Sequence, residues 1–171
     1  MQVVVEAGTM NTVYSHTLDT HSAAETEAVG IQLACAATGG MVITLSGELG
    51  AGKTVLVRGI ACGLNMPPGV AVTSPTYVLQ HIYRGGRLTL YHIDAYRMVG
   101  GSNELEASGL TECFNDDNGL VCVEWPERIP DFPWPADYIA IHIDHYEPQK
   151  RKLVLNANGP RSMLAVKQMV K

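Results

Sequence analysis

The residues Gly47-Glu48-Leu49-Gly50-Ala51-Gly52-Lys53-Thr54 decide the fold of this chain. They fit the pattern G-x-x-x-x-G-K-[ST], which ordinary residue frequencies produce by chance in only about one in a hundred chains of this length. The glycines allow a tight turn that points backbone N–H groups at a phosphate. The lysine supplies a positive charge for the β- and γ-phosphates, and the threonine hydroxyl supplies a ligand for Mg²⁺. Because a plain glycine turn does not explain the Lys-Thr pair, the motif predicts a nucleotide-phosphate site that uses magnesium.

The residues on either side of this loop have the patterns of a strand and a helix. Met41 to Ser46 is a continuous apolar run with β-branched residues, as in a strand buried on both faces, and Thr54 to Leu64 carries apolar residues at helical spacing. Strand, loop and helix in this order form the context that a phosphate loop requires, because the helix N-terminus adds its positive dipole end. The residues expected to bind the nucleotide phosphates are Gly50, Ala51, Gly52, Lys53, Thr54 and Val55.

Helical and strand patterns alternate along the rest of the chain. A strand around Val13 to Leu18 precedes Ser22-Ala23-Ala24-Glu25, which has the spacing of a capping box, so a helix should run from there to about Ala37. The other predicted elements are two hairpins (Tyr77 to Tyr83 with Leu88 to Ile93, and Tyr138 to Ile143 with Leu153 to Leu155), a short helix (Asn103 to Gly109) and a buried strand (Leu120 to Val123). Together they predict an α/β fold, a three-layer P-loop NTPase domain with a mixed parallel and antiparallel sheet.

Length and composition predict one domain. The 171 residues are 46% hydrophobic and 17% charged, as in globular proteins, and no repeat or long linker divides them. We expect a flexible extension over residues 1–11 and a single domain over residues 12–171. No apolar run approaches the roughly 20 residues that span a membrane, and the N-terminus lacks the pattern of a signal peptide. We therefore expect a cytoplasmic protein that makes no membrane contact.

The charge of the chain argues against a protein that grips nucleic acid by itself. The net charge is -5, and phosphate neutralisation needs clustered Lys and Arg, which this sequence lacks. Any nucleic acid should therefore be held by a partner. The four cysteines form no C-x-x-C pair, so we expect reduced, structural thiols at Cys35, Cys62, Cys113 and Cys122.

Two acidic residues end predicted strands and are candidates for the magnesium site. Glu124 ends the run that starts at Leu120, and Asp94 ends the run that starts at Leu88. A phosphate-loop site needs a carboxylate at such a place, where it can hold the metal ion or a water bound to it. Either residue also fits an ordinary strand-end acid, and chemistry alone does not rank the two.

A polar segment and two ring side chains have less specific signals. Thr73-Ser74-Pro75-Thr76-Tyr77 stands where phosphate-loop proteins often carry a loop that senses the γ-phosphate, although composition alone favours a polar turn fixed by its proline. By base rate, Trp125 is a packing aromatic and His92 is a strand residue with its hydrogen bonds satisfied.

Several motifs occur together in one order along the chain. They are the phosphate loop, Thr73 to Tyr77, Tyr91-His92-Ile93-Asp94-Ala95-Tyr96-Arg97, Glu104-Leu105-Glu106 with Gly109-Leu110, and Val123-Glu124-Trp125-Pro126-Glu127. Jointly they resemble the TsaE (YjeE) family over roughly residues 20 to 156. The resemblance implies a small Mg²⁺-dependent ATPase that binds ATP and ADP and works with the proteins TsaD and TsaB. Their product is N6-threonylcarbamoyladenosine at position 37 of tRNA.

The resemblance also implies how the chain takes part in that reaction. It would not transfer the threonylcarbamoyl group itself, and it would meet tRNA only indirectly, through the complex. It would dock on TsaD with its nucleotide close to the joint surface, and ATP hydrolysis would reset the complex between rounds.

Carried over residue by residue, the resemblance assigns roles to the candidates. Thr54 and Glu124 become the magnesium ligands, and Asp94 becomes a supporting acid near the γ-phosphate or its water. Lys53 and the switch-like Thr76 complete the expected catalytic set.

Other roles concern the base and the partner surface. Thr26 is expected near the adenine, Arg151 is expected to approach the base, and Trp125 gains a role near the site or the partner. The sequence departs from the family pattern at Val55, which replaces a second threonine, and at Gly100 to Asn103, which replaces an Asp-Pro-Glu run.

Other nucleotide-binding classes fit less well. A GTPase needs an N/T-K-x-D segment that reads guanine, and this sequence has none. A small-molecule kinase shares the phosphate loop but usually adds an arginine-rich lid, whereas the arginines here are scattered. A kinase is therefore the second choice among the enzyme classes. A third reading is a binding module in which ATP only orders the switch loop.

Overall fold

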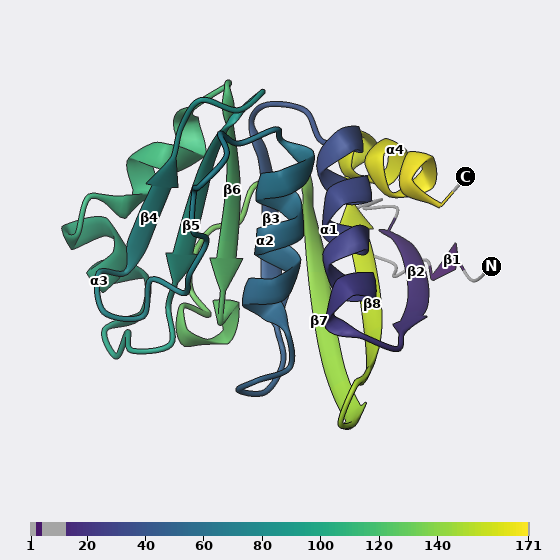
Figure 1. The fold of residues 1–171 in the computed structure, drawn as a ribbon. Helices are drawn as coiled ribbons and strands as arrows, with labels where there is room; N and C mark the ends of the chain where they lie inside the picture. Colours follow the sequence, from purple (N-terminus) through teal and green to yellow (C-terminus); the bar gives the residue numbers. More distant parts are fainter. Residues whose placement is uncertain (1–2, 5–12, 171) are drawn as a thin grey trace.

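The computed structural model describes residues 3–4 and 13–170 and arranges them around one eight-stranded sheet (Figure 1). The strands are β1 (Val3–Val4), β2 (Val13–Thr20), β3 (Met41–Ser46), β4 (Gln80–Tyr83), β5 (Thr89–Asp94), β6 (Gly119–Glu124), β7 (Tyr138–Glu147) and β8 (Lys150–Asn158). The helices are α1 (Ala23–Ala36), α2 (Lys53–Gly63), α3 (Gly101–Ala107) and α4 (Pro160–Met169), with 3₁₀ turns η1 (Leu110–Asn115) and η2 (Pro126–Arg128).

The sheet is mixed, as predicted. Its strand order is β1-β2-β8-β7-β3-β6-β5-β4. β3 pairs in parallel with β6 and β7, and β5 pairs in parallel with β6. The remaining pairs are antiparallel. The carboxyl ends of β3, β5 and β6 therefore meet at one edge, where the phosphate loop leaves β3.

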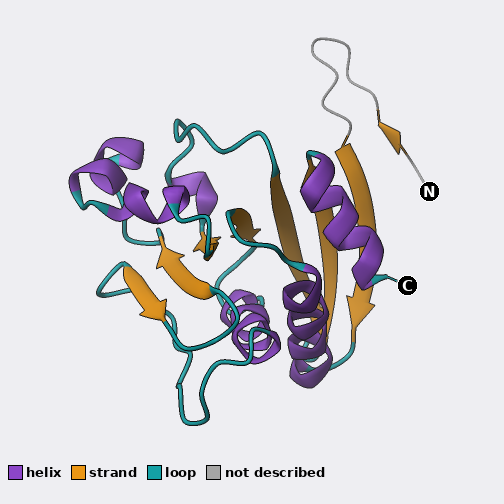
Figure 2. Ribbon diagram, turned by 90° about the horizontal axis from the view of Figure 1, so that it is seen from above, coloured by secondary structure: helices purple, strands orange, loops and turns teal. Residues whose placement is uncertain are grey.

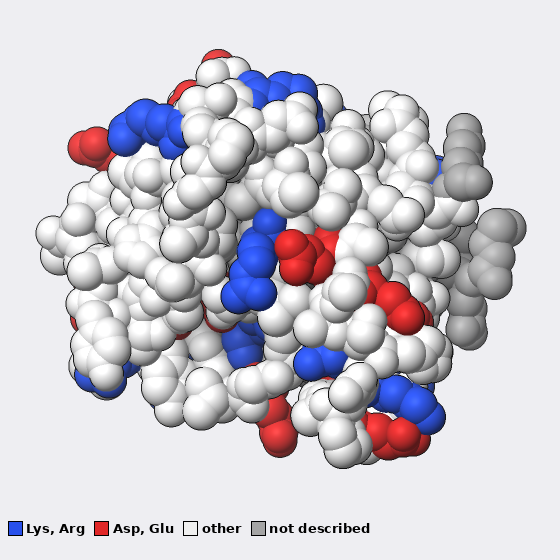
Figure 3. Space-filling model, in the orientation of Figure 1, with Lys and Arg blue, Asp and Glu red and all other residues white. Residues whose placement is uncertain are grey.

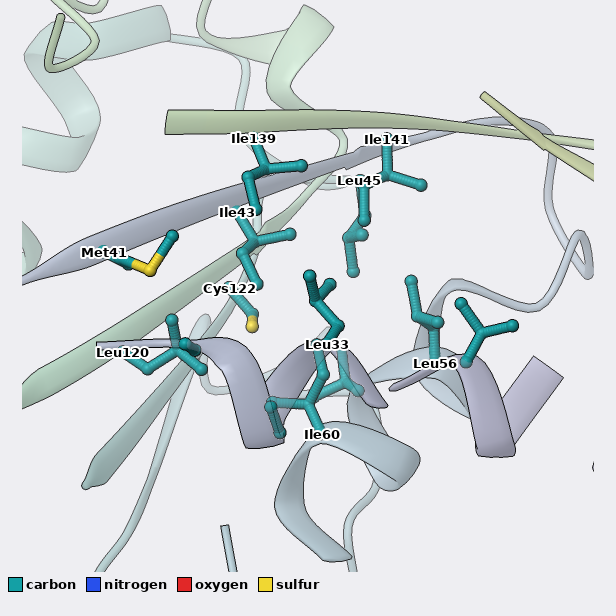
Figure 4. Close-up of a cluster of buried hydrophobic side chains, with 14 of the residues drawn as sticks. Leu33, Met41, Ile43, Leu45, Leu56, Ile60, Leu120, Cys122, Ile139 and Ile141 are labelled. Carbon is teal, nitrogen blue, oxygen red and sulfur yellow. The ribbon is translucent and has the colours of Figure 1, made fainter. Parts of the chain in front are cut away.

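Helices lie on both faces of this sheet, which confirms the three predicted layers (Figure 2). Alternate residues of β3 enter different clusters, because Ile43 and Leu45 pack on the side of α1 and α2 while Val42 packs on the other side. Figure 4 shows Ile43 and Leu45 directed toward Leu33 of α1 and Leu56 of α2. α4 contacts α1 and β8 on the face that α1 and α2 cover. On the opposite face, α3 and η1 contribute residues to the second hydrophobic cluster.

The N-terminus of α1 forms as the capping pattern predicts. The Oγ atom of Ser22 accepts a hydrogen bond of 3.1 Å from the backbone N–H of Glu25. The carboxylate of Glu25 reaches back and accepts a bond of 2.8 Å from the backbone N–H of His21. The first bond satisfies a backbone donor that the helix leaves free, and the second holds the residue before the N-cap against the first turn, so together they fix where α1 starts.

α1 and α2 lie side by side and touch through glycines (Figure 1). A Cβ atom at Gly59 would lie 2.0 Å from the carbonyl oxygen of Glu27, and one at Gly30 would lie 2.3 Å from that of Leu56. Such distances are far below contact, so the two backbones approach as closely as they do only because these positions lack side chains.

The structure corrects the bounds of both hairpins. β4 begins at Gln80 rather than Tyr77, because the N–H groups of Val78 and Leu79 both bond to the carbonyl oxygen of Pro75 and form a turn. Leu79 adopts the left-handed conformation there, with φ +64°. The second hairpin is longer than predicted, since β7 and β8 pair from Tyr138 to Asn158.

α4 was not predicted, and Asp137 helps to explain why it forms. Its carboxylate accepts hydrogen bonds from the backbone N–H groups of Arg161 and Ser162 and from the Ser162 hydroxyl. Burial alone would raise the pKa of Asp137, but these hydrogen bonds and the charge of Arg161 lower it overall. Asp137 lies 24 residues before Arg161 in the sequence, so the residues next to α4 contain no capping pattern that predicts this helix.

The two remaining expectations concern the N-terminus and membranes. Most of the predicted extension over residues 1–11 lies outside the described residues, so the extension stays a prediction, as does the single domain. Val3–Val4 pairs with β2. In the described part of the chain, no helix is both long and apolar enough to cross a membrane.

Candidate phosphate and magnesium site

The glycine loop leads from β3 directly into α2. Gly52 is the N-cap of α2 and adopts φ +113°, a conformation that residues with side chains rarely take. A Cβ atom there would also lie 2.9 Å from the Nε atom of Arg151. Gly50 has φ +82°. The loop therefore places the first N–H groups of α2 at the carboxyl edge of the sheet, as an anion site requires.

Lys53 is the first residue of α2, and only 4% of it is exposed. Its ammonium donates to the carbonyl oxygens of Gly47 at 2.6 Å and Glu48 at 2.9 Å, and it lies 3.7 Å from the ring centroid of Trp125. Burial lowers the pKa of Lys53, and nearby carboxylates, Glu124 above all, oppose that shift. The two hydrogen-bond acceptors of this ammonium are neutral carbonyl oxygens. A charged phosphate oxygen would bind the ammonium more strongly than they do.

Thr54 and Glu124 meet in the way expected of magnesium ligands. The Thr54 hydroxyl donates to Oε1 of Glu124 at 2.9 Å, and Glu124 is only 3% exposed. Neighbouring oxygens around an octahedral Mg²⁺ lie about 2.8 to 3.0 Å apart, because each is about 2.0 to 2.1 Å from the ion. A hydroxyl and a carboxylate are also the oxygen donors that this ion prefers. The residues present therefore fit magnesium.

Asp94 lies beside Glu124 but has different partners. The two are register neighbours in β5 and β6. Asp94 accepts hydrogen bonds from the hydroxyls of Ser74 and Thr76, the latter at 2.7 Å, and from the backbone N–H of Tyr96 at 3.0 Å. The structure thus separates two acids that the sequence left unranked, since Glu124 contacts Thr54 and Asp94 binds the segment Thr73 to Tyr77.

A solvent-open pocket of about 320 Å³ joins these groups. It brings most of the predicted phosphate, metal and catalytic residues together, and it adds three that were not predicted to bind nucleotide: Leu49, Ser74 and Tyr96. Its lining consists of Leu49, Gly50, Gly52, Lys53, Thr54, Val55, Ser74, Thr76, Asp94, Tyr96, Glu124 and Trp125. Ala51, the remaining predicted phosphate-loop residue, is buried and does not line the pocket.

The residues expected near the base lie beside this pocket rather than in its lining. Arg151 donates from Nε to the carbonyl oxygen of Ala51 at 3.0 Å. Thr26 is fully buried, and its hydroxyl bonds to that of Thr20 at 2.8 Å. Thr20 is in turn the register partner of Arg151, so the start of α1 and the turn between β7 and β8 lie at the same end of the sheet. Contact of Thr26 or Arg151 with a base stays a prediction.

Sequence reasoning underestimated two residues at the site. His92 is fully buried and lies with Nε2 2.8 Å from Oε1 of Glu124. Trp125 adopts φ +61° and packs with its ring centroid 4.9 Å from that of Tyr96. The position of His92, two residues before Asp94 on one face of a strand, was a signal that could have placed it beside the neighbouring acid.

Surface charge and metal-ligand clusters complete the description. On the face shown in Figure 3, the Lys and Arg side chains are separated by uncharged or acidic surface and form no continuous basic area. Among the described residues, no group of three or more His, Cys, Asp or Glu side chains is arranged to hold a metal ion. Thr54 and Glu124 are two oxygen donors, which is the small number of protein ligands that Mg²⁺ generally has when nucleotide phosphates and water supply the rest.

Comparison with known families decides the relationship. The model of the family described as "Threonylcarbamoyl adenosine biosynthesis protein TsaE" matches residues 20–153. The chain belongs to the TsaE family. This confirms the resemblance that the five motifs indicated, and the match includes the phosphate loop, both acids and the switch segment.

Individual relatives agree with the TsaE assignment. A Bacillus subtilis protein named tRNA threonylcarbamoyladenosine biosynthesis protein TsaE is 38% identical over 137 residues, which are 80% of this chain and 82% of the relative. One of the same name from Synechocystis sp. is 40% identical over 113 residues, or 63% and 68% of the two chains. A crystal structure of Bacillus subtilis YdiB matches with a TM-score of 0.76 at 30% identity, covering 93% of this chain and 96% of that one. The YdiB structure thus supports the predicted α/β fold.

Proposed function

We propose that this chain is a magnesium-dependent ATPase that serves the biosynthesis of N6-threonylcarbamoyladenosine in tRNA. It acts on a complex of TsaD and TsaB and drives its turnover, without transferring the threonylcarbamoyl group itself. The observation that carries the proposal is the contact of 2.9 Å between Thr54 and Glu124 beside Lys53, in a chain that belongs to the TsaE family.

The phosphate groups of ATP or ADP would be bound by the loop. The N–H groups at the start of α2 donate to phosphate oxygens, and Lys53 exchanges its neutral carbonyl partners for the β- and γ-phosphates. Thr54 and Glu124 would hold Mg²⁺, which when bound neutralises charge on the phosphates. The base would lie toward Thr26 and Arg151, beyond the loop.

Asp94 and the switch segment would sense and position the γ-phosphate end. The hydroxyls of Ser74 and Thr76 now donate to Asp94. A γ-phosphate or its attacking water offers a competing acceptor, so the segment changes partners between nucleotide states. When the hydroxyl of Thr76 leaves Asp94, that carboxylate is free to accept a hydrogen bond from the water and orient it.

The surface supports an indirect role with tRNA. The net charge of -5 argues against direct binding of tRNA by this chain alone. Next to the pocket, Leu49 is 77% and Tyr77 is 84% exposed, and large apolar side chains at a pocket mouth favour contact with a protein partner. TsaD would be that partner, with a cytoplasmic setting for the complex.

The test is ATP hydrolysis by the purified protein, alone and with TsaD and TsaB, together with capture of TsaD with and without nucleotide. We expect slow hydrolysis alone, faster hydrolysis with the partners, and capture that depends on nucleotide. Lys53→Ala should lose nucleotide binding by at least about 100-fold and lose capture with it, because charged hydrogen bonds disappear.

Lys152→Ala is the matched control, since Lys152 lies on an exposed part of β8 and should leave both activities unchanged. The tRNA role is wrong if the protein binds ATP, but TsaD and TsaB do not change its rate of hydrolysis and TsaD is not captured with nucleotide. The chain would then be a kinase or another ATPase.

A further inference from the structure

His92 makes a buried contact that the proposed ATPase site does not use. The side chain is 0% exposed, and its Nε2 atom lies 2.8 Å from Oε1 of Glu124. The other ring nitrogen, Nδ1, is buried and has no hydrogen-bond partner among the described residues. A side chain that only fills space would avoid the free-energy cost of burying such an atom, so packing alone does not explain a histidine here.

The chemistry of the two groups gives the direction of this hydrogen bond. A carboxylate only accepts, so the N–H group at Nε2 of His92 is the donor to Glu124. In the neutral ring, Nδ1 is then an acceptor. The ring lies on β5 and its target lies on β6, in adjacent parallel strands, so both ends of the bond are held by the sheet.

The two side-chain donors to Glu124 meet at the same oxygen. Oε1 receives both the Thr54 hydroxyl, at 2.9 Å, and His92, at 2.8 Å. Among the described residues, Oε2 receives no hydrogen bond. Thr54 is itself a proposed metal ligand, so His92 is the donor that holds the carboxylate independently of the ion.

We propose that His92 is a positioning residue that orients the Glu124 carboxylate for the magnesium ion. This inference rests on the proposed function. A glutamate has three side-chain torsions, and fixing them before the ion arrives removes part of the ordering cost of metal binding. Donors behind a metal-binding carboxylate act in this way in many metal sites.

The experiment measures metal binding separately from activity. The full chain is saturated with ADP, and Mn²⁺ is titrated as the probe while the electron paramagnetic resonance signal of free Mn²⁺ is recorded. His92→Phe keeps a ring but has no donor, and we expect it to weaken Mn²⁺ binding roughly 10- to 100-fold. His92→Gln keeps a donor that reaches Glu124, and it should restore most of the affinity. ADP binding in EDTA should stay the same in both.

Tyr91→Phe is the matched control. Tyr91 precedes His92 in β5 and donates to Asp116 at 2.8 Å, away from the pocket, so this change removes one hydrogen bond from the same strand without touching Glu124. It should leave Mn²⁺ affinity unchanged. Thermal melting of each variant shows whether it is folded.

The outcomes separate the two proposals. If the unchanged protein binds neither ADP nor Mn²⁺, the proposed function is wrong and the inference falls with it. If it binds both and His92→Phe binds Mn²⁺ equally well, only the inference is overturned. Should His92→Phe not fold, His92→Asn replaces it, because the shorter amide does not reach Glu124. Equal Mn²⁺ affinity in His92→Asn and His92→Gln then overturns the inference.

Discussion

The two halves of the sheet are built differently. The strands β3, β6 and β5 are parallel and are covered on both faces, since their alternate residues enter both hydrophobic clusters. The strands β7, β8 and β2 pair antiparallel with one another. Among their described residues, only Tyr138 at the start of β7 packs against the second cluster, and the other packed hydrophobic residues lie on the face toward α1 and α4. Along β8, Leu153 and Leu155 are buried while Lys152 is exposed.

This difference shows why the candidate site lies where it does. Glu124 and Asp94 end strands in the covered half, are 3% and 2% exposed, and are held by Thr54 and Ser74 among others. Asp144, in the open half, is exposed to water, and its one side-chain partner among the described residues is His142 at 3.1 Å. Charged groups act more strongly where water is excluded, so the same carboxylate chemistry has larger consequences in the covered half.

The largest effect should follow from neutralising one carboxylate in each half. Glu124→Gln keeps the side-chain volume but removes the charge, so we expect retained nucleotide binding and a fall of about 100-fold in Mg²⁺-dependent ATP turnover. Asp144→Asn should leave turnover unchanged. Steady-state hydrolysis and nucleotide titration check both variants. Normal turnover by Glu124→Gln would remove the metal assignment and direct attention to Asp94.

A second effect compares two valines on the same side of the sheet. Val42 is buried against the second cluster, whereas Val154 of β8 is only half-buried. Val42→Ala should reduce the free energy of unfolding by about 2 kcal/mol, since it removes two buried carbon atoms and leaves a cavity, and Val154→Ala should cost less than about 1 kcal/mol. Urea unfolding measures both. Equal losses would mean that the open face is covered after all.

Features that depend on neighbouring residues could be predicted from the sequence. The bounds of β3 follow from its unbroken apolar run, and α1 follows from a local cap at Ser22. Residues that act through the tertiary fold were not predictable in this way. His92 meets Glu124 across 32 positions, and the cap of α4 comes from Asp137. Local patterns carry information about backbone conformation. Contacts between residues far apart in the sequence depend instead on how the strands are ordered in the sheet.

The ranking of the two acids shows the same limit within the site. Glu124 and Asp94 have equivalent patterns, each at the end of an apolar run, and only the fold reveals that one faces Thr54 and the other faces Thr76. The phosphate loop itself was predictable because all of its chemistry lies in consecutive residues.

The smallest effect concerns Asp137, which ties α4 to the sheet at the start of β7. Because its folded pKa lies below the ordinary value of 3.8, Asp137 stabilises the protein above that value, and this contribution is lost as the pH falls through the lowered pKa. Asp137→Asn should cost about 1 kcal/mol at pH 7, because the hydrogen bonds from Arg161 and Ser162 lose a charged acceptor. The difference from the unchanged protein should shrink toward pH 3. Urea unfolding across this range tests it, with the exposed Asp131→Asn as control. A pH-independent difference would contradict the ionic part of the explanation.

The glycine contacts between α1 and α2 have a consequence for how the site accommodates its ligand. Backbone touches backbone at Gly30 and Gly59, so no side chain is available there to adjust the spacing of the two helices. Both helices start at the edge of the sheet that carries the phosphate loop, and their N-termini are therefore held at a fixed separation. A molecule that reaches from the start of α2 to the start of α1 would have to match the separation that these glycine contacts set.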